Sequence, residues 1–305
     1  MKPVVRDLRE GGSWTFGQWL KNGLIYHVAM LGLRLASRWS RQTRRARLAT
    51  LGRWVPAVAP HLRRTALKNI ARIAPQHDSA SRERLVVENF SNLSMELANA
   101  IERWAGQDSA EERAGYPLFD DARRVLDEAC GQGRGVVLPS AHLANWERVA
   151  RGIVSAGYPF VTLVRRAYDP RLDDAVLQPL RAGVSTIARG EPGAATAVVR
   201  ALRRRAILGA PMDLASRVPS VDVPFFGVLT PFPVGPATLA LRTGAPIVVA
   251  TWEARETDGG FVEGIGAEPI PTEGDARAVT AAIAAALERR IAAAPERWVL
   301  VHSRW

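Results

Sequence analysis

The sequence of 305 residues is long enough for one large α/β domain or two small ones, and its composition, 47% apolar and 23% charged, is that of a globular protein. Its single cysteine, Cys130, excludes an intramolecular disulfide and a metal site of several cysteines, and it is typical of a reducing compartment such as the cytoplasm. The first dozen residues lack a compact apolar core with a cleavage site, so we expect no secretory signal.

The net charge of +11 is concentrated near one end of the sequence. Residues 1–75 contain fifteen Lys or Arg residues and two acids, Asp7 and Glu10, which gives a local charge of +13 and leaves −2 for the other 230 residues. A basic segment joined to a near-neutral body favours contact with a polyanionic surface, either an anionic membrane or a nucleic acid.

The apolar content of the basic segment favours the membrane. Residues 22–33 form a charge-free span of about 12 residues, short of the roughly 20 needed to cross a bilayer, and arginines follow it. The segment also contains Trp14, Trp19, Trp39 and Trp54. We therefore predict an interfacial helix pair on an anionic membrane surface. The alternative is a buried helix with a solvated basic face. Nucleic acid is disfavoured because no DNA- or RNA-binding module pattern appears.

The predicted elements begin with helices over residues 13–105, clearest at 63–70 and 81–104. Further predicted helices are 120–130, 145–155, 170–180, 194–204 and 279–294. Predicted strands are 135–138, 160–164, 185–188, 206–210, 221–226, 247–251, 261–265 and 298–302. This alternation predicts an α/β fold with a mixed, largely parallel sheet flanked by helices. We expect a single domain, residues 1–305, with a basic helical layer (1–105) before an α/β core (120–305).

The stretch after the strand predicted at 135–138 places a histidine and a carboxylate five positions apart. On one regular helix His142 and Glu147 would lie about 140° apart. They meet only if His142 lies in the turn and Glu147 in the first turns of the next helix, for which Asn145 is a suitable N-cap. Sites cluster at the carboxyl ends of strands in open α/β sheets. A neutral His142 that donates to Glu147 suits a general base toward a hydroxyl. The alternative is a loop histidine beside a solvated carboxylate.

Residues 141–147, Ala-His-Leu-Ala-Asn-Trp-Glu, resemble the H-x-x-N-W-E signature of the lysophospholipid-type acyltransferases of lipid A biosynthesis, the lauroyl/myristoyl transferase family. The mycobacterial phosphatidylinositol mannoside acyltransferases belong to the same superfamily. Other blocks agree in order from about residue 15 to residue 305. They are R-x-x-A-x-x-N-[LI] at 63–74, E-R…F…E at 81–96, V-x-V-P-F-F-G…T at 221–230, T-G-A-P at 241–248 and P-E-Q-W…H-x-R-W at 295–305, where Arg297 stands in place of the glutamine.

The resemblance implies a membrane-peripheral or monotopic O-acyltransferase on the cytoplasmic face of the inner membrane. The acyl donor would be acyl carrier protein or acyl-CoA, and the acceptor a hydroxyl of a glycolipid such as a lipid A precursor. His142 would take the hydroxyl proton and Glu147 would hold the imidazole, the family's H-x4-E pair. No metal, cofactor or covalent enzyme intermediate is implied.

The resemblance also implies substrate-binding residues. Arg165 and Arg166 match a basic position of the family and are expected to bind a phosphate of the acceptor or donor, or the collapsing oxyanion. A solvated pair of arginines is the alternative. Asn145 and Asp213 are expected to contact substrate as well.

The sequence departs from the family at Pro211, where relatives usually have the first acid of a D-Q-D or E-R-D block. Only the final acid, Asp213, is kept. This departure leaves open an acceptor other than lipid A, or a catalytically inactive homologue that binds lipid or acyl carrier. A thioesterase that uses the same pair on water is a further alternative.

The acyl chain is expected in an apolar groove, for which ordinary core is the alternative. The candidate residues are Phe225, Phe226, Phe232 and 239–241. His302 is expected to be a packed structural histidine. The sequence contains no P-loop, Rossmann glycine fingerprint, G-x-S-x-G elbow or zinc-ligand spacing.

Overall fold

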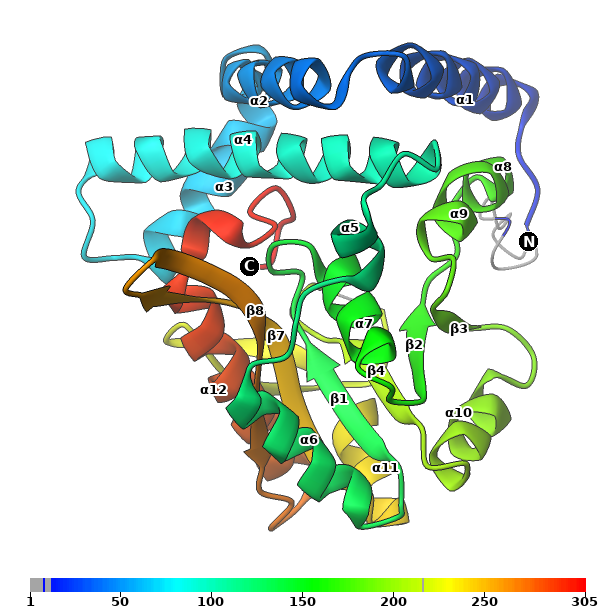
Figure 1. Ribbon diagram of the computed structural model, residues 1–305, viewed down its shortest axis with the longest axis vertical. Helices are drawn as coiled ribbons and strands as arrows, with labels where there is room; N and C mark the ends of the chain where they lie inside the picture. Colours follow the sequence, from blue (N-terminus) through cyan, green and yellow to red (C-terminus); the bar gives the residue numbers. More distant parts are fainter. Residues whose placement is uncertain (1–7, 9–11, 216) are drawn as a thin grey trace, which may run out of the picture.

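The computed structural model describes Leu8 and residues 12–215 and 217–305. Its first part is helical, with α1 (Phe16–Ser37), α2 (Arg41–Val58), α3 (Pro60–Ile73) and α4 (Ser79–Trp104). Figure 1 shows α1 and α2 along one edge of the molecule, next to the long helix α4. Within the described ranges, none of the helices combines the length and apolarity needed to span a bilayer.

A six-stranded sheet forms the centre of the remaining chain. Its spatial order is β3 (Ser185–Ala188), β2 (Phe160–Val164), β4 (Ile207–Pro211), β1 (Val136–Ser140), β7 (Ile247–Thr257) and β8 (Gly260–Ile270). Neighbouring strands are parallel except for the β7–β8 hairpin. The residues of β1 are all buried, as expected for a strand covered on both faces. The predicted α/β class with a mixed, largely parallel sheet is confirmed.

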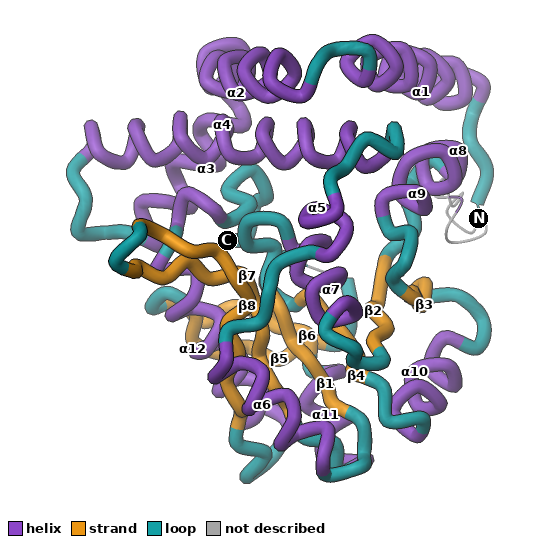
Figure 2. The backbone as a smooth tube through the Cα atoms, viewed as in Figure 1, coloured by secondary structure: helices purple, strands orange, loops and turns teal. Residues whose placement is uncertain are grey.

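Helices flank this sheet on both faces (Figures 1 and 2). They are α6 (Asp120–Gly131), α7 (Trp146–Ser155), α10 (Ala194–Arg203), α11 (Gly235–Thr243) and α12 (Ala276–Ala293), and the short helix α5 (Ala110–Ala114) packs against α7. The helix predicted at 170–180 is divided into α8 (Pro170–Leu172), a π-helical turn (Asp173–Leu177) and α9 (Gln178–Leu180). Figure 2 shows helices joined by loops along the edge formed by α1, α2 and α4.

A separate antiparallel hairpin, β5 (Ser220–Phe225) and β6 (Val228–Pro233), lies outside the main sheet. The sequence pattern predicted β5 but missed β6. Prolines at 231 and 233 interrupt the apolar pattern of β6, and prolines normally argue against a strand unless it lies at an edge.

The strand predicted at 298–302 is wrong. A 3₁₀ turn (Pro295–Arg297) leads into a turn, and Trp298 forms only one isolated antiparallel bridge, with Leu143. Side-chain amides of Asn69 and Asn89 bind carbonyls of this segment, and these bonds take the place of a strand neighbour. We call residues 295–305 the closing segment.

Candidate active site

The register of two neighbouring strands brings a histidine and an aspartate together. Ser140 at the end of β1 pairs with Pro211 at the end of β4, and His142 and Asp213 each follow two residues later. Nδ1 of His142 lies 2.7 Å from Oδ1 of Asp213. The backbone N–H of His142 donates to Oδ2 of the same carboxylate at 2.9 Å. The pair therefore stands at the carboxyl ends of two parallel strands, where α/β proteins place their sites.

The Asp213 carboxylate is fully buried and also accepts a hydrogen bond from Nε1 of Trp298 at 2.7 Å. Burial alone would raise the pKa of Asp213, but the charge and hydrogen bonds of His142, together with the Trp298 bond, bring that pKa below its ordinary value. An ionised carboxylate only accepts hydrogen bonds, so Nδ1 of His142 carries the proton. Nε2 is left with a free lone pair and is the basic atom of the site.

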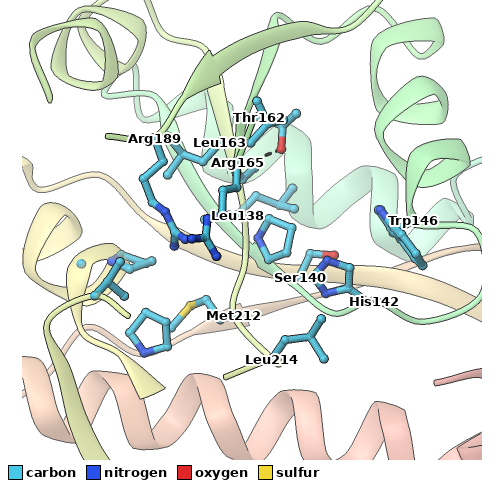
Figure 3. Close-up of a pocket in the computed structure, with 18 of the residues that line it drawn as sticks. Leu138, Ser140, His142, Trp146, Thr162, Leu163, Arg165, Arg189, Met212 and Leu214 are labelled. Atoms are coloured by element: carbon cyan, nitrogen blue, oxygen red, sulfur yellow. Dashed lines mark hydrogen bonds between the residues drawn. The ribbon is translucent and has the colours of Figure 1, made fainter. Parts of the chain in front are cut away.

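His142 borders a cavity of about 750 Å³, and its side chain is 24% exposed. Burial alone would lower the pKa of His142. The charge and hydrogen bond of Asp213, with a smaller contribution from the charge of Glu147, raise it above the ordinary value instead. The ring of Trp146 packs edge-on against the imidazole with the centroids 4.8 Å apart (Figure 3).

Glu147 does not hold the imidazole, contrary to the prediction. It lies in the first turn of α7 as expected. Its carboxylate faces Nε of Arg181 at 3.6 Å, while Nδ1 of His142 is bound to Asp213. Glu147 lines the same cavity, and its negative charge contributes to the raised pKa of His142.

The structure separates Arg165 from Arg166. Val164 pairs with Ala188 across β2 and β3, so Arg165 and Arg189 follow at the same level of the sheet. Both line the cavity, and Figure 3 shows their guanidinium groups side by side. Arg166 is bound to Glu191 and Asp173 and does not line the cavity. Arg189 could not be identified from the sequence, because its position beside Arg165 depends on which strands are neighbours.

The charged side chains that line the cavity are mostly basic. They are Arg165, Arg181, Arg189, Arg242 and Glu147. Among residues 12–215 and 217–305, no acid lies within ion-pair distance of Arg165, Arg189 or Arg242. Burial lowers the pKa of Arg189, and the charge of Arg165 lowers it further. Two adjacent guanidinium groups without a carboxylate form a site suited to an anion with several oxygens.

A family model described as bacterial lipid A biosynthesis acyltransferase matches residues 7–305. The chain belongs to this family. The relatives it resembles include phosphatidylinositol mannoside acyltransferases of Mycobacterium tuberculosis, 31% identical over 59% of this chain, and of Mycolicibacterium smegmatis, 32% identical over 59%. These matches cover 57% and 60% of the relatives' own lengths. A lipid A biosynthesis palmitoleoyltransferase of Escherichia coli is 26% identical over 85% of this chain and 84% of its own.

Within the family's motif, the acid that this chain retains is the one that meets the histidine. Asp213 was expected to bind substrate, but it has no exposed surface and lies against His142. The replacement of the first family acid by Pro211 therefore leaves His142 with a partner. His142 and Asp213 each lie two residues beyond the end of a strand. This spacing is visible in the sequence, but it identifies the pair only when β1 and β4 are known to be neighbours.

Asn145 has a structural part in the motif. It is the N-cap of α7, as predicted: its side-chain oxygen accepts the N–H of Arg148 at 3.0 Å. Its amide donates to Oε2 of Glu96 at 2.6 Å, and Asn145 does not line the cavity. Burial raises the pKa of Glu96, while hydrogen bonds from Asn99 and Asn145 oppose that rise. The amide therefore ties the loop after His142 to α4.

The apolar part of the cavity comes from the sheet and from α11. The lining includes Leu138, Phe160, Leu163, Met212, Leu214 and Leu239. Of the residues expected to form an acyl groove, Leu239 lines the cavity. Phe225 and Phe232 are fully buried among other aromatic rings, so the core alternative holds for them.

Proposed function

We propose that this chain transfers a fatty acyl group from a thioester donor, acyl carrier protein or acyl-CoA, to a hydroxyl of a glycolipid. The observation that carries the proposal is the His142–Asp213 pair at the edge of a cavity, in a chain that belongs to an acyltransferase family. Nε2 of His142 takes the hydroxyl proton while the oxygen attacks the thioester carbon. The C–S bond then breaks, and the leaving thiolate takes the proton back from the imidazolium, which Asp213 stabilises by its charge.

The basic and the apolar side chains of the cavity lining suit the two parts of such substrates. Arg165 and Arg189 would bind a phosphate of the acceptor or the donor, with several charge-assisted hydrogen bonds. The apolar lining would hold the acyl chain, at about 0.8 kcal/mol for each buried methylene. The names of the relatives, which specify phosphatidylinositol mannoside and lipid A, support a glycolipid acceptor.

We further propose that α1 and α2 bind the protein to the anionic cytoplasmic face of the inner membrane. Large apolar side chains of both helices are exposed: Phe16, Trp19, Leu20, Leu24, Ile25, Val28, Leu31, Leu35, Leu51, Trp54 and Val58. A patch of this kind is typical of a contact surface. Exposed basic residues lie among them: Lys21, Arg34, Arg38, Arg47 and Arg53. This combination matches an interfacial helix pair.

The direct test is to incubate purified protein with acyl carrier protein and CoA thioesters and liposomes that contain a glycolipid extract, and to identify the products by mass spectrometry. The wild type should yield acylated lipid. His142→Ala should lower the rate about 100-fold or more, since a general base contributes on that order. His61→Ala, an exposed histidine on α3, is the matched control and should be unaffected.

Each other outcome contradicts the proposal in a specific way. Free fatty acid without acylated lipid indicates a thioesterase. No consumption of any donor indicates an inactive binding homologue. Unchanged turnover in His142→Ala removes His142 from the mechanism.

A further inference from the structure

The closing segment crosses directly over the loop that carries His142. Trp298 pairs with Leu143 in an isolated bridge, and the N–H of Ala144 donates to the carbonyl of Arg297 at 2.8 Å. Ala144 has φ +47°, a left-handed conformation that residues with a Cβ adopt infrequently. The bond from Arg297 therefore holds a backbone conformation that this loop would not favour by itself.

Trp298 also contacts the partner of the histidine. Its indole N–H donates to Oδ2 of Asp213, and Trp298 has no exposed surface. The other two hydrogen bonds to this carboxylate come from His142 itself, through Nδ1 and the backbone N–H. Among the residues that the structure describes, Trp298 thus supplies the one hydrogen bond to the Asp213 carboxylate from outside the pair, and that bond restricts rotation of the carboxylate behind the imidazole.

The backbone around Trp298 is anchored by two helices. Nδ2 of Asn89 on α4 donates to the carbonyls of Glu296 at 2.8 Å and Trp298 at 2.5 Å. Nδ2 of Asn69 on α3 donates to the carbonyls of Leu300 and His302, both at 2.8 Å. Two helices therefore fix the backbone on both sides of Trp298.

We infer that Trp298 is a positioning residue for the proposed acyl transfer: its indole N–H fixes the Asp213 carboxylate that holds His142, and so sets both the direction and the proton affinity of Nε2. The inference rests on the proposed function only in that His142 acts as the base. Trp298 itself does not line the cavity.

The direction of the expected change follows from the sign of the N–H dipole. The positive end of this dipole lies against Asp213. The unprotonated His142–Asp213 pair carries a net negative charge and the protonated pair is neutral, so removal of the N–H destabilises the unprotonated pair more. The proton affinity of the pair rises. The other titratable groups that face the pair are Glu147 on α7, and His302 and Arg304 in the closing segment. The substitution below changes none of them.

The test is Trp298→Phe, which keeps an aromatic ring and removes the N–H. We expect kcat to fall about tenfold with KM for the donor within about twofold, because the contact acts on the base and not on substrate binding. The acid limb of the kcat/KM profile should move to higher pH by about 0.5–1 unit.

The matched control is Trp305→Phe. Trp305 lies in the same aromatic cluster, 6.2 Å from Trp298 between ring centroids, and its N–H donates to Thr230. This variant should leave the pH profile in place. A pH profile of Trp298→Phe that superimposes on the wild type overturns the inference, and so does an equal shift in Trp305→Phe.

A second measurement does not need the enzyme activity. The titration of His142 is followed by NMR in protein labelled at the histidine ring nitrogens, with its signal assigned by its absence from His142→Ala. If Trp298→Phe does not fold, the benzothienyl isostere of tryptophan at position 298 replaces N–H by sulfur at nearly constant shape. A raised His142 titration supports the inference even if no acyl transfer is found, whereas an unshifted titration in an active enzyme refutes it and leaves the proposed function intact.

Discussion

Two carboxylates raise the pKa of His142, but only Asp213 touches it. Asp213→Asn keeps the shape of the side chain and removes its charge. The imidazolium then loses the charge that stabilises it, and Nδ1 of His142 loses a partner that can only accept a hydrogen bond. We expect kcat to fall about 10²–10⁴-fold. Burial, which lowers the pKa of His142, then acts without the opposing charge, so the acid limb of kcat/KM should move to lower pH. A pH series of initial rates measures both effects.

Glu147→Gln is the matched comparison, because it removes a charge near His142 without breaking the contact to Nδ1. Its loss in kcat should be smaller than that of Asp213→Asn, and its acid limb should move less. The reverse ranking, with Asp213→Asn active and Glu147→Gln inactive, would show that Glu147 is the partner during turnover.

At the scale of elements, the joint between α4 and the closing segment can be tested through stability. Asn89→Ala removes the donor to the carbonyls of Glu296 and Trp298, and Asn89 is fully buried. Each carbonyl keeps one other donor, Asn92 for Glu296 and the N–H of Leu300 for Trp298, so the expected effect is the loss of two hydrogen bonds. At about 0.5–1.5 kcal/mol for each bond, the free energy of unfolding should fall by about 1–3 kcal/mol. Urea denaturation followed by circular dichroism gives the value.

Asn92→Ala is the control for this change. Asn92 lies one turn along α4 and donates to the same Glu296 carbonyl, but at 3.4 Å and from a partly exposed position. Its effect should stay within about 0.5 kcal/mol, the usual range for a surface substitution. If Asn89→Ala and Asn92→Ala lower the free energy of unfolding equally, the two bonds from Asn89 do not stabilise the closing segment more than the single bond from Asn92.

The same elements show what the sequence could predict and what it could not. Runs of apolar residues located β1 and β2 and most other strands, because periodicity reports burial along one segment. Which strands become neighbours depends on the whole topology. That is why Arg189 was missed and the partner of His142 misassigned: both depend on pairings, β2 with β3 and β1 with β4. The apolar residues of the closing segment predicted a strand. In the structure side-chain amides of Asn69 and Asn89 bind its carbonyls, and sequence periodicity does not reveal such bonds.

At the scale of the whole molecule, the candidate site and the exposed apolar helices share one side. The arrows of β1 and β2 in Figure 1 point toward the edge formed by α4, α1 and α2. His142 and Arg165 follow the ends of these two strands. A protein that rests on lipid through α1 and α2 would therefore turn its cavity half toward the membrane, which shortens the path for a lipid acceptor.

The electrostatic part of membrane binding can be isolated with two exposed arginines near the C-terminal end of α1. Neither Arg34 nor Arg38 has an ion-pair partner among the residues that the structure describes. Each basic residue near an anionic surface contributes about 1 kcal/mol, so Arg34→Gln with Arg38→Gln should weaken binding to anionic vesicles roughly 30-fold. Vesicle sedimentation over a range of lipid concentrations measures the partition coefficient.

Arg203→Gln with Arg204→Gln changes the net charge by the same amount at the end of α10, far from α1 in Figure 1, and should leave binding unchanged. Salt should weaken binding of the wild type, because the screening length falls from about 10 Å at 0.1 M to about 3 Å at 1 M. If both double variants lose affinity equally, net charge and not the α1–α2 face attracts the protein. Equal binding of the wild type to neutral vesicles at high salt would leave only the apolar side chains to explain the attachment.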